Sequence, residues 1–149
     1  MLYIYMSIKE LEQEIIDEFS IFENWMEKYE YIIELGKDLP IIEEKYKTDD
    51  FLIKGCQSRV WLQASYTNSK LYLTADSDAI ITKGIIALLI KVLNKQNPDD
   101  ILTAKLRFID EIGLKSHLSP TRANGLLGMV KQIKNFAMAF KLKENANKS

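Results

Sequence analysis

Two β-rich runs in the middle of the chain place the strongest constraint on its fold. Residues 60–66 and 71–74 are rich in strand-forming side chains, and residues 67–69 between them form a turn signal. Two such runs joined by a short turn predict an antiparallel hairpin. The apolar residues elsewhere recur at helical spacing, so we expect helices to surround this hairpin.

Two helices are predicted before the hairpin. Ser7 and Glu10 fit a capping box at the start of the first, and apolar residues recur at helical spacing from there to Phe19. The second is predicted over residues 22–35, with Gly36 as its C-terminal cap. We interpret the aromatic stripe of this second helix as core and not as a ligand site.

The longest apolar segment follows the hairpin. Residues 78–93 predict a buried helix, capped at its start by Asp76 or Ser77. Gly84 inside this segment weakens a helix, which suggests that another backbone approaches closely there.

Shorter helices and one long helix are predicted after this segment. Asn97 and Pro98 indicate the start of a short helix, and residues 108–112 add another turn. Ser119, followed by proline, is the clearest helix start in the chain, and apolar spacing continues from it to Phe140.

These elements together predict an α+β fold. We expect a small antiparallel β-sheet of about three strands with several α-helices packed on one side. At 149 residues the chain is expected to form a single domain, residues 1–149. Residues 1–6 are interpreted as a candidate N-terminal extension, because Met6 is an alternative start, and residues 142–149 as a frayed tail.

The charge and cysteine content exclude several classes of protein. The net charge is −1 at pH 7, which gives no overall field for nucleic acid or for an anionic membrane. The longest apolar segment is too short to span a bilayer, and Lys83 and Lys91 interrupt it. One cysteine allows neither an internal disulfide nor a multi-cysteine zinc site. We expect a cytoplasmic protein that binds no nucleic acid and no membrane.

The single cysteine, Cys56, lies just before the first predicted strand. Gly55 precedes it and two small polar residues follow, so we expect a sharp turn that presents the thiol at a loop tip. A lone cysteine is usually a small buried hydrophobe, but no helical or strand face requires this one. A nucleophilic Cys56 would need a positive charge nearby, because the thiolate is the reactive form.

Arg122 is the candidate for that charge. It lies in the first turn of the last predicted helix, where a cation is unfavourable by about 0.3–1 kcal/mol. This placement suggests an anionic partner, and we hypothesise that Arg122 and the free N–H groups of the helix start stabilise a Cys56 thiolate or persulfide. The alternative is a solvent-facing arginine tolerated at small cost.

His117, the only histidine, and two acidic residues are further candidates. A Cys56–His117 pair would suit a thiol hydrolase, but no orienting acid or amide is recognisable, which favours a histidine that holds loop backbone. Asp76 and Asp78 are interpreted as caps of the following helix. No phosphate-binding glycine loop, dinucleotide fingerprint or His-Glu metal motif is present, which disfavours a nucleotide-dependent enzyme.

Four motifs together resemble the SufE family of sulfur acceptors, which work with a pyridoxal-phosphate cysteine desulfurase. They are residues 25–36 (WMEKYEYIIELG), 55–61 (GCQSRVW), 75–79 (ADSDA) with Lys83-Gly84, and 117–126 (HLSPTRANGL). They keep the family's order and extend over most of the chain. Arg59 departs from the pattern, since many relatives carry glutamine there.

The resemblance implies a function for the cysteine. Cys56 would accept sulfane sulfur from a SufS-like cysteine desulfurase, become a persulfide and pass the sulfur to a SufBCD-like iron–sulfur scaffold. Arg122 would lie near the Cys56 loop, and Asp78 would influence its resting state, in which the cysteine is tucked into an apolar pocket. The chain would need no cofactor, because pyridoxal phosphate belongs to the partner. It would be a carrier and desulfurase activator without independent turnover.

Three alternatives stay open. The chain could be a sister acceptor that serves another desulfurase and another destination, such as tRNA thiolation. It could instead be a non-covalent regulatory module of a desulfurase, in which case Cys56 would be dispensable. A hydrolase built on Cys56 and His117 would act on acyl substrates without a partner, but it lacks the orienting groups.

Overall fold

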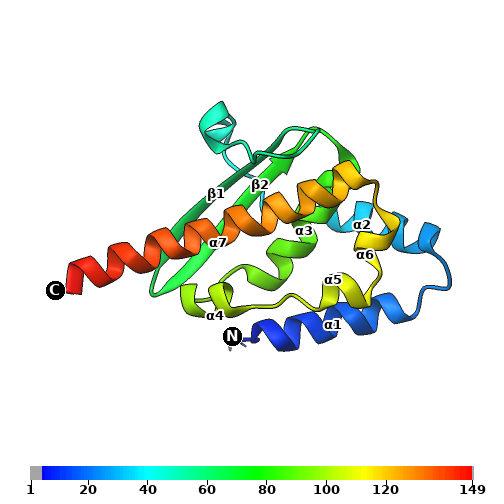
Figure 1. Cartoon of the computed structure of the whole chain (residues 1–149), viewed down its shortest axis with the longest axis horizontal. Helices are drawn as coiled ribbons and strands as arrows, with labels where there is room; N and C mark the ends of the chain where they lie inside the picture. Colours follow the sequence, from blue (N-terminus) through cyan, green and yellow to red (C-terminus); the bar gives the residue numbers. More distant parts are fainter. Residues whose placement is uncertain (1–4, 149) are drawn as a thin grey trace.

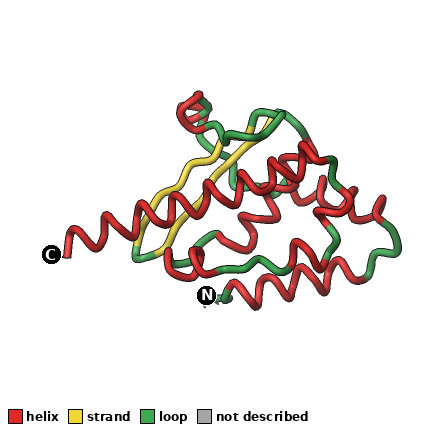
Figure 2. The backbone as a smooth tube through the Cα atoms, in the orientation of Figure 1, coloured by secondary structure: helices red, strands yellow, loops and turns green. Residues whose placement is uncertain are grey.

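The computed structural model describes residues 5–148, and it has the predicted α+β architecture (Figure 1). One long hairpin lies at the upper left of the tube in Figure 2, with α7 crossing in front of it and most of the other helices below and to the right. The elements, in chain order, are α1 (Ile8–Ser20), α2 (Trp25–Gly36), η1 (Glu44–Tyr46), η2 (Asp49–Phe51), β1 (Val60–Thr67), β2 (Lys70–Ser77), α3 (Ile80–Leu93), α4 (Pro98–Thr103), α5 (Phe108–Glu111), α6 (Leu114–His117) and α7 (Pro120–Lys148).

The predicted hairpin is confirmed, but the sheet is smaller than expected. β1 and β2 pair antiparallel from Val60 opposite Ser77 to Thr67 opposite Lys70. The two turn residues between the strands have positive φ, as the tightest hairpin turns require. The prediction of about three strands is wrong for the described residues: the sheet has two strands, and the segments beside it make only single bridges, Ile41 with Ala75 and Leu52 with Trp61.

One face of the hairpin carries the core. Alternate residues of both strands are buried, as expected for a sheet with helices on one side. Tyr66, on that face, stacks on Phe140 of α7 with ring centroids 5.3 Å apart. Figure 1 shows α7 running along the hairpin, with its first turns near the end where β1 begins and β2 ends.

The close approach predicted at Gly84 is confirmed at the crossing of α2 and α3. A Cβ atom on Gly84 would lie 2.2 Å from the carbonyl oxygen of Ile32, so only glycine fits. Gly36 belongs to the same crossing, since its Cβ would lie 3.1 Å from the Gly84 nitrogen. The prediction that Gly36 caps α2 is therefore wrong; the C-cap is Lys37, which has ordinary right-handed angles.

Three predicted helix starts are confirmed, and a fourth moves. Ser7 and Glu10 form the capping box of α1, the Asn97 side chain caps α4, and Ser119 accepts a hydrogen bond from the Arg122 N–H at the start of α7. α2 begins at Trp25 and not at residue 22, because the Asn24 side chain accepts a hydrogen bond from the Glu27 N–H and fixes the first turn there.

The start of α3 differs from the prediction. β2 continues to Ser77, so Asp76 lies in the strand opposite Trp61 and cannot cap a helix. Ala79 occupies the N-cap position and makes no side-chain cap. The Ser77 hydroxyl accepts a hydrogen bond from the Ala79 N–H, which secures the turn between strand and helix.

Both ends of the described chain are tied to the domain. The Gln96 side chain donates to the Met6 carbonyl at 2.9 Å and accepts from the Tyr5 hydroxyl at 2.7 Å. Residues 1–4, the rest of the candidate extension, lie outside the described residues. The tail expected to fray is helical to residue 148, and Glu144 accepts a hydrogen bond from the Tyr66 hydroxyl. Within residues 5–148, no helix combines the length and apolar character needed to cross a membrane.

Candidate functional site

Cys56 lies at the tip of a loop, residues 54–59, that leads into β1, as predicted. The Ile53 N–H donates to the Val60 carbonyl at 2.8 Å and closes the base of this loop. Gly55 has a φ of +90°, a backbone angle that other residues rarely adopt, and it reverses the chain just before the cysteine. The sequence Gly-Cys therefore places the sulfur at a turn.

The thiol faces helix α7. Cys56 is half-buried, and its Sγ–H donates to the carbonyl oxygen of Gly125 over 3.7 Å. Burial raises the pKa of the Cys56 thiol above its usual value. In this position of the loop the sulfur is therefore mostly a protonated thiol at neutral pH, the less reactive form.

A small cavity of about 80 Å³ adjoins the thiol. The residues around it come from the loop, α3 and the first turns of α7: Cys56, Gln57, Ser58, Thr82, Ile85, Thr121, Arg122, Gly125 and Met129. Pockets that hold organic ligands usually measure about 300–1,000 Å³, so this one suits a single atom or a very small group.

Arg122 and Cys56 both line this cavity. Arg122 is exposed, and within residues 5–148 no carboxylate lies in ion-pair distance of its guanidinium. Its five N–H donors are therefore available to an anion. A negative charge on the Cys56 sulfur would therefore be favoured by the positive charge of Arg122.

Asp78 holds the end of the loop that leads into β1. Its Oδ1 accepts a hydrogen bond from the Arg59 N–H at 3.0 Å, and its own N–H donates to the Arg59 carbonyl at 3.2 Å. Arg59 is the last residue before β1. Asp78 thus acts on the base of the loop and is not among the residues around the cavity.

His117 does not join the cavity. Its ring stacks on Trp25 of α2, with centroids 4.5 Å apart, and its Nδ1 is 2.8 Å from the Gly113 carbonyl. Because a carbonyl only accepts, Nδ1 carries the proton in this contact. This is the arrangement of a histidine that holds loop backbone.

A neighbouring ion cluster was not predicted. Asp76 pairs with Lys47 at 2.6 Å and with Lys83 at 3.3 Å, and only 14% of the Asp76 side chain is exposed. Lys47 also lies over the Trp61 ring, 5.8 Å from its centroid. Asp76 was interpreted as a helix cap, and no spacing in the sequence pairs it with Lys47, which comes from the connector before the loop.

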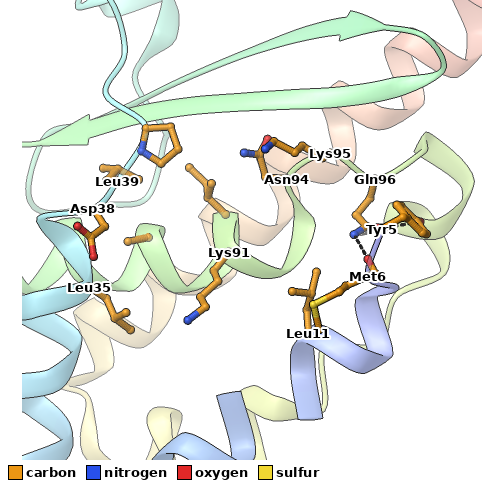
Figure 3. A pocket seen from close by; sticks show the side chains of 13 residues that line it. Tyr5, Met6, Leu11, Leu35, Asp38, Leu39, Lys91, Asn94, Lys95 and Gln96 are labelled. Carbon is orange, nitrogen blue, oxygen red and sulfur yellow. Dashed lines mark hydrogen bonds between the residues drawn. The ribbon is translucent and has the colours of Figure 1, made fainter. Parts of the chain in front are cut away.

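Two cavities larger than the one beside the thiol lie away from Cys56. One of about 490 Å³ lies between α1, α2 and α3, and Figure 3 shows Lys91 and Asp38 at its wall. Another, of about 620 Å³, lies beside the start of α1. Neither includes Cys56 or Arg122 among its lining residues. Cys56 and these two cavities are therefore separate features of the fold.

Comparisons with known proteins identify the family of the chain. Residues 13–137 match the sequence model of the family described as SufE, the Fe-S metabolism associated domain. An uncharacterized SufE-like protein of Rhizobium meliloti (strain 1021) is 36% identical over 129 residues, which cover 83% of this chain and 92% of that protein.

A solved structure supports the fold. The solution structure of a hypothetical protein from Thermus thermophilus superposes with a TM-score of 0.74, covering 90% of this chain and 97% of that one. At 18% identity, this likeness concerns the fold alone. The family model matches most of the chain, and the SufE-like relative is similar over most of its length. These two matches support a general role in iron–sulfur metabolism and sulfur transfer. They show that the chain belongs to the SufE family.

Proposed function

We propose that Cys56 carries sulfane sulfur from a pyridoxal-phosphate cysteine desulfurase to an iron–sulfur scaffold. The observation that supports this most is the pairing of a loop-tip thiol with Arg122 across a cavity of about 80 Å³. This cavity is too small for an organic substrate but has room for one additional sulfur atom. In this proposal the sulfur atom is delivered by another protein.

The transfer is a thiol exchange. The Cys56 thiolate attacks the outer sulfur of the desulfurase persulfide, a new S–S bond forms on Cys56, and the donor's S–S bond breaks. The desulfurase cysteine leaves as a thiolate, so no external oxidant or reductant is needed. A nucleophile on the scaffold then removes the outer sulfur from Cys56 in the same way. The reaction requires no cofactor on this chain.

The surrounding residues have separate roles in this proposal. Arg122 stabilises the anionic sulfur of Cys56 as thiolate or persulfide. Asp78 restrains the base of the loop through Arg59, and so controls how readily the thiol leaves α7. His117 supports the fold through Trp25 and takes no part in the transfer. The protein would work in the cytoplasm, where thiols stay reduced.

The half-buried resting position fits this role. A persulfide is easily removed by small thiols, so a carrier benefits from shelter between its two partners. Burial also raises the pKa of the Cys56 thiol, which keeps it unreactive until the loop moves. Docking of the desulfurase would supply the interactions that draw the loop outward.

Alanine release by the desulfurase of the same organism tests the proposal. We expect the wild-type chain to stimulate release severalfold and Cys56→Ser to abolish the stimulation. Leu142→Ala, at an exposed apolar side chain in the C-terminal half of α7, serves as the control and should behave as wild type. Full stimulation by Cys56→Ser would overturn the carrier role in favour of a non-covalent regulator. No stimulation by the wild type would contradict the choice of partner.

A further inference from the structure

Two glycines of α7 lie directly under the Cys56 loop. Gly125 and Gly128 are three residues apart, so they share one face of the helix. A Cβ on Gly128 would lie 2.8 Å from the carbonyl oxygen of Lys54. A Cβ on Gly125 would lie 3.3 Å from the Sγ of Cys56. The loop therefore rests on a part of α7 that has no side chains.

The two contacts differ in what a methyl group would do. The atom opposite Gly128 belongs to the backbone of the loop, which can make room only by moving away from α7. The atom opposite Gly125 is the end of a side chain, which needs a shift of only a few tenths of an ångström. Gly128 therefore tolerates a side chain less well than Gly125 does.

Few hydrogen bonds of the described residues hold the loop on α7, and the loop has space to leave it. Its hydrogen bonds with Val60 and Asp78 lie at its base and not at its tip. The tip itself donates one hydrogen bond to α7, from Cys56 to the Gly125 carbonyl, which at 3.7 Å is long and weak, and the half-buried Cys56 also packs against the core. A Cβ on Gly55 would meet no atom within 4 Å, so that part of the loop faces open space.

We propose that Gly128 is a positioning residue for Cys56: because it has no side chain, the loop backbone lies directly on α7 and the thiol stays half-buried beside Arg122. This inference concerns the same cysteine as the proposed function. It rests on the proposed function only where it concerns a persulfide on Cys56. In a chain with a methyl group at position 128, the Cys56 persulfide would be exposed and lost faster to small thiols.

Alkylation of Cys56 in the purified full chain tests the inference without any partner. We would measure the rate with iodoacetamide over a series of pH values for wild type, Gly128→Ala and the control Leu127→Ala, an exposed residue of the same helix. Among the described residues, Arg122 is the only other ionisable one around the thiol's cavity, and every variant keeps it. The profile therefore reports the burial of the thiol.

For Gly128→Ala we expect alkylation at neutral pH to rise on the order of three- to tenfold, because burial no longer suppresses the thiolate. The midpoint of the pH profile should move down toward the ordinary thiol value. Leu127→Ala should match the wild type. A loss of stability that leaves the loop in place would not move this midpoint. An unchanged rate and midpoint in a folded Gly128→Ala variant would overturn the inference.

A second variant keeps the test decisive. Alanine favours a helix more than glycine does, so Gly128→Ala is expected to fold. If circular dichroism shows that it does not, Gly125→Ala should give a smaller rise in the same assay, and an unchanged rate would then overturn the inference. Iodoacetamide needs no desulfurase, so a failure of sulfur transfer would leave this result intact, and a null result here would leave the transfer proposal standing.

Discussion

Asp78 and Arg59 are joined by two hydrogen bonds at the base of the Cys56 loop. The Asp78 carboxylate accepts from the Arg59 N–H at 3.0 Å, and the Asp78 N–H donates to the Arg59 carbonyl at 3.2 Å. The Ser77 hydroxyl donates to the same carbonyl at 2.8 Å. Both backbone polar groups of Arg59 are thereby fixed, so movement of the thiol must begin on the tip side of this residue or break these bonds.

Removal of the Asp78 carboxylate should loosen the loop. One net hydrogen bond contributes about 1 kcal/mol, so Asp78→Ala should raise the iodoacetamide alkylation rate of Cys56 by up to about fivefold. Asp78→Asn keeps a side-chain oxygen that can accept from Arg59, and should stay near the wild-type rate. Equal rates for Asp78→Ala and wild type would show that this pair does not restrain the thiol.

The charge of Arg122 should be detectable with two alkylating reagents. Iodoacetate is an anion and iodoacetamide is neutral, so the guanidinium beside Cys56 should favour the first. In Arg122→Ala we expect the ratio of the iodoacetate rate to the iodoacetamide rate to fall severalfold. Arg107→Ala, which removes the same charge beside the 620 Å³ cavity, is the control and should keep the wild-type ratio. An unchanged ratio in Arg122→Ala would contradict its role beside the thiol.

Asp76 should make the free energy of unfolding depend on pH in the acidic range. Partial burial raises the pKa of Asp76, but hydrogen bonds from Lys47, the Ser77 N–H and Lys83 outweigh it and lower the pKa below 3.8. The folded state therefore binds this proton less readily than the unfolded chain. The stabilisation is fully present at a pH above the pKa of Asp76 in the unfolded chain. It is lost as the pH falls through the lower pKa of Asp76 in the folded state.

Urea unfolding between about pH 6 and pH 2 measures this effect. The free energy of unfolding of the wild type should fall more steeply toward low pH than that of Asp76→Asn. Asp99→Asn, at an exposed carboxylate that pairs with Lys141, should retain the wild-type slope. Parallel curves for wild type and Asp76→Asn would show that the cluster adds no acid-dependent stability.

Gly84 should be the least tolerant glycine of the fold. Gly84→Ala places a methyl group 2.2 Å from the Ile32 carbonyl and forces α2 and α3 apart, which should cost about 3 kcal/mol or more. Ile80→Ala, at an exposed position of the same helix, should change the unfolding free energy by less than about 0.5 kcal/mol. Denaturant titration compares the two, and near-native stability of Gly84→Ala would refute the close crossing.

Local chemistry made much of this fold predictable. Ser7, Asn97 and Ser119 start helices because their side chains accept hydrogen bonds from the first turn, and these bonds are all present. The hairpin and the close approach at Gly84 also follow from residue type and spacing. At the site, the loop position of Cys56 was predicted from the residues beside the cysteine. Its proximity to Arg122 was hypothesised from the place of Arg122 in the first turn of a helix, and both residues line one cavity.

Several other contacts between distant segments were not predictable from the pattern. Gly36 looked like a helix cap, but it serves a helix crossing that depends on Gly84, far later in the chain. Asp76 looked like a cap, but β2 extends through it, and its partner Lys47 comes from an irregular connector. Gly125 appeared only as one letter of the 117–126 motif and Gly128 not at all, and their closeness to the loop is visible only in the folded structure. Such pairs are set by tertiary packing.

Intact-protein mass spectrometry of Cys56 tests the central claim most directly. The chain would be mixed with the cysteine desulfurase of the same organism and free cysteine, and its mass recorded before and after reduction. The account predicts a gain of one sulfur atom that is lost on reduction and absent in Cys56→Ser. No gain in the wild type, under conditions in which the desulfurase still releases alanine faster, would contradict a persulfide on Cys56.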